Sequence, residues 1–138
     1  MKKGISPEEC LKNAKTVAVV GISPNPERPS NYVTRRLIEN MGGRIKVFLI
    51  NPGYAGQNIH GIEVLPSLSS VPEKIDIVNV FRNKEQIEEV ILEAIKCGAG
   101  CVWLQPGTEN PPVIEKYKDK IPIIYNSCIG VVSGLLKK

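Results

Sequence analysis

The sequence predicts an α/β protein with a doubly wound, mostly parallel sheet of five strands and helices on both faces. Short apolar runs alternate with segments of helical periodicity from end to end, which is typical of βαβ units. The first apolar run, Val17–Val20, contains no polar residue, as expected of a strand that is buried on both faces. Because 138 residues are enough for one core, we expect a single domain over 1–138.

The first elements have clear local signals. The segment Ser6–Glu9 provides an N-cap, a proline at the first helical position and a capping-box glutamate, which predicts a helix over about 7–13. Residues Thr16–Gly21 form the first strand. The next helix begins at Ser30, has an apolar stripe at helical spacing, and ends at the Gly42-Gly43 pair.

The second strand covers Arg44–Asn51 and ends in an Asn-Pro-Gly turn signal. Residues 54–70 have no clear period, apart from a short strand at Gly61–Leu65 and a turn of helix after Pro66. The third long strand is Ile75–Phe81, and the next residue but one, Asn83, is placed to cap the helix that follows.

The last strands, Ala99–Leu104 and Ile121–Tyr125, flank a helix at Glu109–Tyr117. Right-handed crossovers between parallel strands then favour the strand order 3-2-1-4-5. In such sheets, ligands bind beyond the carboxyl ends of the strands, where the strand order reverses. This rule selects the loops at 22–30, 51–54, 81–84 and 103–108.

The loop after the first strand has the features of a phosphate site. A buried strand that leads through Gly21 into a helix start leaves unpaired N–H groups at the sheet edge, where phosphate binds well. We expect amides near Ser30 and the Ser23 hydroxyl to donate to it, with Arg28 adding a charged bond and Ser30 capping the helix. The loop lacks G-x-G-x-x-G, so a nucleotide other than NAD is favoured. The alternative is a proline-stiffened loop with an ordinary serine cap.

Two more strand ends offer contacts for a nucleotide. The second strand closes on Asn51-Pro52, a neutral amide where an acid would favour the ribose of NAD, although turn chemistry alone also explains this pair. Phe81 and Arg82 follow the third strand and could stack on an adenine and pair with phosphate. The alternative is that Phe81 is a core residue and Arg82 a surface charge.

The fourth strand end and the remaining candidate residues do not suggest catalysis. Trp103 is expected partly in the core, with Gln105 and the Gly107 turn directed toward the mouth of the cleft. The pattern offers no Ser-His-Asp arrangement, no paired carboxylates at strand ends and no histidine in the cleft, and we expect His60 on the surface. Cys128 is either small buried filler or, if its pKa is lowered, a redox-active thiol.

Composition argues against several classes of protein. The net charge is only +4, and two Phe, one Trp and four Tyr are too few for a base-stacking platform, so we expect no nucleic-acid partner. The start, MKKGISPEEC, has no apolar h-region. No apolar run approaches the roughly 18 residues of a membrane helix, so a cytoplasmic location is expected.

The cysteines and the one histidine do not have the spacing of a zinc site, so no metal is expected. Four cysteines without a C-x-x-C pair fit neither a secreted disulfide framework nor a redox motif. We expect reduced thiols, with a bridge between Cys97 and Cys101 as the alternative in a thermophile.

Taken in order, these motifs resemble the CoA-binding domain family. Its members are related to the N-terminal domain of the succinyl-CoA synthetase alpha subunit and of ADP-forming acyl-CoA synthetases. The matching stretches are AVVGISPNPERPSNYVTRRL, VFLINPGYAGQNIHGIEVLPSLSSVPEKIDIVNVFRNKE, and CVWLQPGTEN to IIYNSCIG, from about Lys15 to Gly130. The resemblance implies a Rossmann-like fold that binds coenzyme A.

The resemblance also implies which residues bind. The phosphate loop would comprise Gly21, Ile22, Ser23, Arg28, Pro29 and Ser30. The nucleotide would be flanked by Asn51, Pro52, Phe81 and Arg82. The pantetheine path would be lined by Trp103, Leu104 and Gln105. Asn126, Cys128 and Gly130 look like the closing N-x-C-x-G turn of the family.

In the multidomain synthetases the phosphorylated histidine lies on a separate domain, which this sequence does not include. We therefore expect a non-catalytic binding module, carrier or subunit, with CoA or acyl-CoA as its ligand and no membrane partner. The alternative is an enzyme, either an NAD(P)-linked oxidoreductase or an exchanger of CoA thiols and disulfides through Cys128. A third reading is an interaction subunit with a vestigial cleft. A homodimer or a partner enzyme subunit is the expected assembly.

Overall fold

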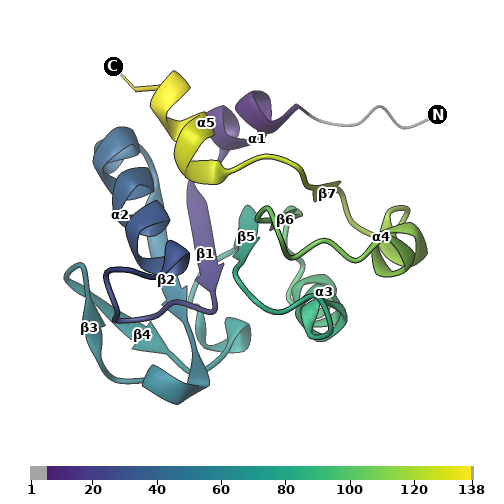
Figure 1. Cartoon of the computed structure of the whole chain (residues 1–138), viewed down its shortest axis with the longest axis horizontal. Coiled ribbons are helices and arrows are strands. Elements are labelled where there is room, and N and C mark those ends of the chain that lie inside the picture. Colours follow the sequence, from purple (N-terminus) through teal and green to yellow (C-terminus); the bar gives the residue numbers. More distant parts are fainter. Residues whose placement is uncertain (1–5, 138) are drawn as a thin grey trace.

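The computed structural model describes residues 6–137, which form a mostly parallel sheet with helices on both faces (Figure 1). The strands are β1 (Thr16–Val20), β2 (Lys46–Ile50), β3 (Asn58–Ile59), β4 (Ile62–Leu65), β5 (Ile77–Val80), β6 (Cys101–Leu104) and β7 (Ile123–Ile124). They lie in the order β3-β4-β2-β1-β5-β6-β7, and every neighbouring pair is parallel except β3 and β4. The predicted α/β class is confirmed.

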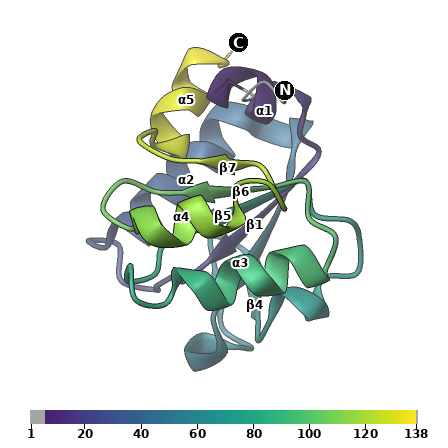
Figure 2. The ribbon, with the colours of Figure 1, turned by 90° about the vertical axis from the view of Figure 1, so that its right-hand side faces the viewer.

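The helices divide between the two faces of the sheet. They are α1 (Pro7–Asn13), α2 (Pro29–Met41), α3 (Ile87–Lys96), α4 (Pro111–Tyr117) and α5 (Ile129–Leu135). The buried residues of α1, α2 and α5 pack on one face, and those of α3 and α4 pack on the other. Figure 2 shows α3 and α4 in front of the sheet. Within residues 6–137, none of these helices combines the length and hydropathy needed to cross a bilayer.

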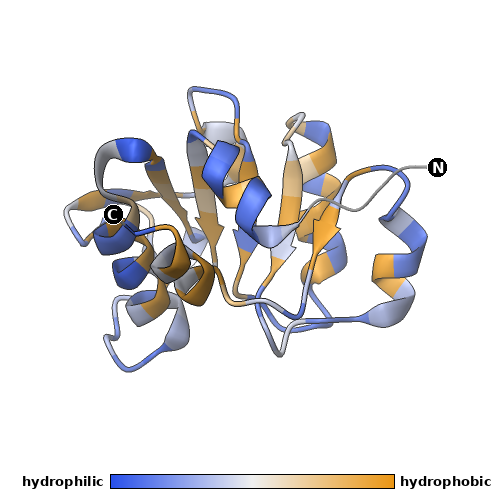
Figure 3. Cartoon of the chain, turned by 90° about the horizontal axis from the view of Figure 1, so that it is seen from above, coloured by the Kyte–Doolittle hydropathy of each residue, from blue (hydrophilic) through white to orange (hydrophobic). Residues whose placement is uncertain are grey.

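The core consists of two apolar layers separated by the sheet. In β1, Val17 and Val19 face α2 whereas Ala18 and Val20 face α3, and all five residues of the strand are buried. This confirms that the first strand is buried on both faces. Figure 3 shows hydrophobic strands between helices that carry both hydrophobic and hydrophilic residues.

The predicted order of the strands needs one correction. The sheet has seven strands, and the third long strand, β5, lies beside β1 rather than at the far side of β2. The order 3-2-1-4-5 holds only when the short β4 is counted as the third strand. β4 has four residues and only one of them is buried, so its sequence pattern is weak, and the two-residue β3 was not predicted at all. Because β4 occupies the free edge of β2, β5 pairs with the other side of β1.

The side-chain cap expected from the sequence is present at the start of α1 but not at the start of α3. The α1 helix begins as expected, because the Ser6 hydroxyl accepts a hydrogen bond from the Glu9 N–H at 3.1 Å. The expected cap at Asn83 is wrong: α3 begins at Ile87, and the Asn83 carbonyl instead accepts a hydrogen bond from the Gln86 N–H at 2.8 Å. Residues 83–86 therefore form a turn ahead of the helix.

Candidate functional site

A cleft of about 820 Å³ lies at the carboxyl ends of the parallel strands, between the loops that follow β1, β2, β5 and β6. The connection after β1 leads to α2 on one face of the sheet, and the connection after the neighbouring β5 leads to α3 on the other face. The cleft is therefore at the topological switch point, where ligands of such folds bind. All four loops selected from the sequence contribute to its wall. Nine of the predicted site residues line it: Gly21, Ile22, Ser23, Arg28, Pro29, Ser30, Asn51, Phe81 and Arg82.

Gly21 brings the first and third of these loops into direct contact. Its φ is 95°, and a Cβ atom on it would overlap the main-chain carbonyl oxygen of Phe81 and lie 3.2 Å from Cδ of Arg82. Only glycine combines this dihedral angle with this lack of bulk. The loop after β1 can therefore pass against residues 81–82, and both loops face the same cleft.

The loop from Ser23 to Arg28 is held by its own hydrogen bonds. The Ser23 hydroxyl accepts from the Asn25 N–H at 3.1 Å, and the Asn25 side-chain oxygen accepts from the Glu27 N–H at 3.0 Å. The Asn31 side-chain amide donates to the Ser23 carbonyl at 2.9 Å. The loop is thus ordered before any ligand binds, and the Ser23 hydroxyl keeps its proton free to donate.

The start of α2 differs from the expected serine cap. Pro29 is the first residue of the helix and Arg28 is the N-cap, with no side-chain capping bond, so Ser30 lies inside the first turn and is buried. Proline is favoured at the first helical position because its ring fixes φ and its missing N–H is not needed there. The prediction that Ser30 caps the helix is therefore wrong.

This helix start also offers fewer free amides than the sequence suggested. The Arg28 carbonyl accepts hydrogen bonds from the Asn31 and Tyr32 N–H groups at 2.9 and 3.2 Å. Among residues 6–137, no partner is recorded for the N–H of Ser30. The first turn contains no acidic residue, so the positive end of the helix dipole is not neutralised locally.

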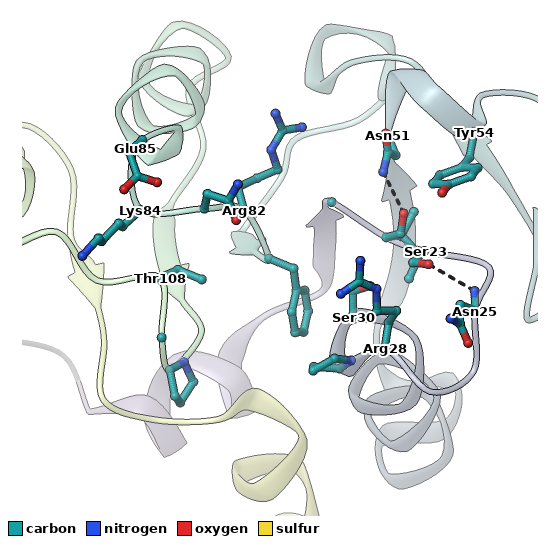
Figure 4. A pocket seen from close by; sticks show the side chains of 17 residues that line it. Ser23, Asn25, Arg28, Ser30, Asn51, Tyr54, Arg82, Lys84, Glu85 and Thr108 are labelled. Carbon is teal, nitrogen blue, oxygen red and sulfur yellow. Dashed lines mark hydrogen bonds between the residues drawn. The ribbon is translucent and has the colours of Figure 1, made fainter.

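The end of β2 contributes mainly a brace. The Asn51 side-chain amide donates to the Ile22 carbonyl at 2.8 Å, and its oxygen accepts from the Gly53 N–H at 2.9 Å. The nitrogen of this amide therefore joins the loops after β1 and β2 (Figure 4), and its oxygen closes the turn at 51–53. Pro52 is exposed and does not line the cleft, whereas the half-buried Tyr54 does.

Three cations surround the cleft. Arg28 and Lys84 are exposed and Arg82 is half-buried, while Glu85 is the one acidic side chain of the lining. The ion pairs found in residues 6–137 involve none of these four residues. Figure 4 shows Arg28 and Lys84 on opposite sides, with Arg82 between them. The lining thus has a formal excess of two positive charges (three cations and one acid), which suits a ligand with several phosphate groups.

The end of β6 does not face the cleft. Trp103, Leu104 and Gln105 are buried and absent from the lining. The Trp103 ring N–H donates to the Ser127 carbonyl at 2.8 Å, and the Gln105 side-chain oxygen accepts from the Ile129 N–H at 2.9 Å. The expectation that Gln105 points toward the mouth is therefore wrong, because its amide is used at the start of α5.

Sequence reasoning left out several residues of the lining. They are Asn25, Tyr54, Asn83, Lys84, Glu85, Pro106 and Thr108. Most of them lie inside the four loops that the strand-end rule had selected, so the available signal was loop position rather than residue type. Gly107, expected near the mouth, does line the cleft.

The lining offers little for acid–base or metal chemistry. Its residues include no histidine, cysteine or aspartate, and within residues 6–137 no three His, Cys, Asp or Glu side chains gather in a metal-binding group. His60 is exposed, as predicted, with Nε2 3.1 Å from the Asn31 carbonyl oxygen. Cys128 is half-buried outside the lining. The arrangement is suited to binding an anion.

Comparison with known proteins gives a family match. A family described as CoA binding domain matches residues 15–134. The Bacillus subtilis protein YneT is 32% identical over 131 residues, which cover 94% of this chain and 93% of YneT. A hypothetical protein from Pyrococcus horikoshii OT3 has a solved structure that superimposes with a TM-score of 0.84 at 32% identity, covering 99% of both chains.

A longer relative shares the same region. The alpha subunit of the ADP-forming acetate–CoA ligase II of Pyrococcus furiosus is 23% identical over 132 residues. The match covers 88% of this chain but 28% of that subunit. The chain thus corresponds to just over a quarter of the ligase subunit.

Proposed function

The chain belongs to the CoA binding domain family, and from this membership we propose that its cleft binds coenzyme A, with the protein acting as a non-catalytic binding module, carrier or subunit. The observation that supports this most directly is the set of three cations, Arg28, Arg82 and Lys84, around a cleft at the switch point of the sheet. Coenzyme A has a diphosphate and a 3′-phosphate, so it can use several cations at once.

The size of the cleft and the bracing of its loops are consistent with this ligand. A volume of about 820 Å³ lies within the range of roughly 300–1,000 Å³ that is usual for small-molecule sites. Gly21 lets the first loop pass against residues 81–82, so that the loops after β1 and β5 meet at the cleft. The loops are already braced by the bonds of Ser23 and Asn51, so little ordering is needed on binding.

Each wall then has a role in the proposed complex. The diphosphate lies over the first loop, where the Ser30 N–H, the Ser23 hydroxyl and the Arg28 guanidinium can donate. The adenosine lies near Phe81 and Tyr54, whose rings border the cleft. Arg82 and Lys84 are left for the remaining phosphate. The turn at 106–108, rather than the buried segment before it, borders the pantetheine arm.

The enzymatic alternatives have weaker support. An NAD(P)-linked reaction lacks the usual ribose-binding acid after β2, since Asn51 stands there with both ends of its amide engaged. An exchange of thiols through Cys128 requires that side chain to reach the ligand, and it does not line the cleft. A binding role requires neither.

The assembly and location are also part of the proposal. The ligase subunit of Pyrococcus furiosus contains a region similar to this chain, so action beside a partner enzyme subunit is a reasonable setting. A homodimer and a cytoplasmic location, both expected from the sequence, remain proposals. The ligand would be free CoA or acyl-CoA.

A ligand panel tests the proposal. The purified protein is heated with CoA, acetyl-CoA, NAD, NADP or ATP, because a ligand that binds only the folded state raises the melting temperature. We expect a rise with CoA, with or without an acyl group, and calorimetric binding at micromolar Kd or tighter. No rise and no binding heat with either CoA form would reject the proposal, and a larger rise with NAD or NADP would favour the oxidoreductase.

A further inference from the structure

Two buried cysteines from distant parts of the chain lie in contact. Cys10 is in α1 and Cys101 is the first residue of β6, and their Sγ atoms are 3.2 Å apart. The two residues are 8% and 3% exposed and are separated by 91 positions in the sequence. The bridge between Cys97 and Cys101 considered from the sequence is therefore not the one that the fold favours, because the partner of Cys101 is Cys10.

We propose that Cys10 and Cys101 form an internal disulfide under oxidising conditions, a covalent modification site that ties α1 to the sheet. The sulfur atoms need to approach by only about 1 Å to reach the bond length of roughly 2 Å. The other two cysteines are less well placed to form a bond with Cys10 or Cys101. Cys128 contacts the Gln105 amide, with the side-chain nitrogen 3.4 Å from Sγ, and Cys97 lies half-buried after α3.

The oxidant is a small disulfide, such as glutathione disulfide. The thiolate of Cys10 attacks one of its sulfur atoms, which forms a mixed disulfide and releases one glutathione thiolate. The thiolate of Cys101 then attacks Sγ of Cys10, which closes the internal bond and releases the second. Two electrons pass to the oxidant, and the two thiol protons end on two molecules of glutathione.

Opening of α1 gives the oxidant access. This helix has seven residues and buries only Cys10 and Leu11, so it is a small unit that can open without the rest of the fold. Cys10 lies on this helix, whereas Cys101 is in the central sheet. Opening of α1 therefore exposes Cys10 first, and Cys10 is suited to be the first nucleophile.

The site is independent of the proposed coenzyme A cleft. Cys101 stands at the amino end of β6, whereas the cleft is at the carboxyl ends of the strands. A bond across 91 positions restricts the unfolded chain strongly, and a stabilisation typical of such bonds raises the melting temperature by about 10 °C in a chain of this size. The affinity of the cleft for CoA should not change.

The experiment uses the full chain, refolded with oxidised and reduced glutathione or with reductant alone. Free thiols are then alkylated in denaturant and counted by mass spectrometry. We expect two alkylated cysteines after oxidation, a linked pair of peptides that contain Cys10 and Cys101, and a melting temperature higher by about 10 °C that dithiothreitol reverses. Four alkylated cysteines, retained glutathione, or a link through Cys97 or Cys128 would overturn the proposal.

Two variants make the assignment secure. The double variant C97S/C128S contains only the proposed pair and should keep the full shift in melting temperature. Cys10→Ser should lose it, leaving the same melting temperature with and without oxidant. If Cys10→Ser fails to fold, the double variant still decides, because an oxidised form without a bond or without a shift would contradict the inference.

Discussion

A Cβ atom on Gly21 would overlap the carbonyl oxygen of Phe81 and lie 2.9 Å from its carbonyl carbon. We therefore expect Gly21→Ala to destabilise the fold and to weaken ligand binding, because the loop after β1 must move away from residues 81–82. The φ of 95° alone costs alanine about 1–3 kcal/mol, and the displaced backbone adds to it. Denaturant unfolding and CoA titration measure the two effects.

Gly56→Ala is the matched control for this substitution. Gly56 has a φ of 93°, yet a Cβ there would meet nothing within 4 Å, and it is outside the cleft. It should show the cost of the dihedral angle alone and leave CoA affinity unchanged. If both variants lose the same stability and neither loses affinity, the contact between the two loops is unimportant.

How far the sequence predicts this molecule depends on the range of each interaction. The start of α1 is predicted because Ser6 and Glu9 are three residues apart. The loops of the cleft are predicted because parallel strands place their carboxyl ends at one edge. By contrast, the place of β4 beside β2 depends on pairing within the sheet, and the direction of Gln105 depends on the Ile129 N–H, 24 positions away. The short strand itself was expected at Gly61–Leu65, but contacts made across the fold leave no local pattern, so its place in the sheet and the direction of Gln105 were missed.

The guanidinium groups of the cleft provide the test of its charge. We expect Arg28→Ala and Arg82→Ala each to weaken CoA binding about tenfold, as a charged hydrogen bond to phosphate contributes roughly 1.5 kcal/mol or more. Arg35→Ala is the control, since Arg35 is exposed on α2 outside the lining. Calorimetry at fixed ionic strength measures all three. Equal affinity for the three variants would mean that the ligand does not meet these cations.

The acidic residue of the lining should act in the opposite direction. Glu85 is exposed and would repel a polyphosphate, so Glu85→Gln should tighten CoA binding two- to fivefold, the size of an exposed charge interaction. Glu89→Gln changes the same charge on the exposed surface of α3, outside the lining, and should have a smaller effect. A loss of affinity in Glu85→Gln would contradict an anionic ligand on this side of the cleft.

The contact between α3 and α4 should make stability depend on pH. The Tyr117 hydroxyl donates to the Glu88 carboxylate at 2.6 Å, and Lys116 pairs with the same oxygen at 3.0 Å. Hydrogen bonding from Tyr117, followed by that from Lys116, lowers the pKa of Glu88. A carboxyl with a lowered pKa stabilises the fold above its unfolded pKa of about 4.3, and this contribution is lost as the pH falls through the folded value.

Tyr117→Phe tests this contact. It should bring the pKa of Glu88 back toward its ordinary value, and the difference in unfolding free energy between pH 7 and pH 3 should become smaller. Carboxyl titration by NMR follows the first effect and denaturant unfolding the second. Tyr125→Phe, at an exposed position, should leave both unchanged. An unaltered Glu88 pKa in Tyr117→Phe would show that the hydroxyl does not hold the charged carboxyl in solution.

A substitution of Gln105 tests whether this residue is structural or contacts the ligand. The family resemblance assigns Gln105 to the pantetheine path, whereas its side-chain oxygen accepts a hydrogen bond from the Ile129 N–H at 2.9 Å. Gln105→Leu leaves that buried N–H without a partner, which should cost about 1–3 kcal/mol of unfolding free energy. CoA affinity should change less than about twofold, since the residue is 3% exposed and does not line the cleft. Gln57→Leu, at an exposed position, controls for the change of residue type. A variant with normal stability but strongly weakened binding would instead place Gln105 against the ligand, and the start of α5 would then have to move when the ligand binds.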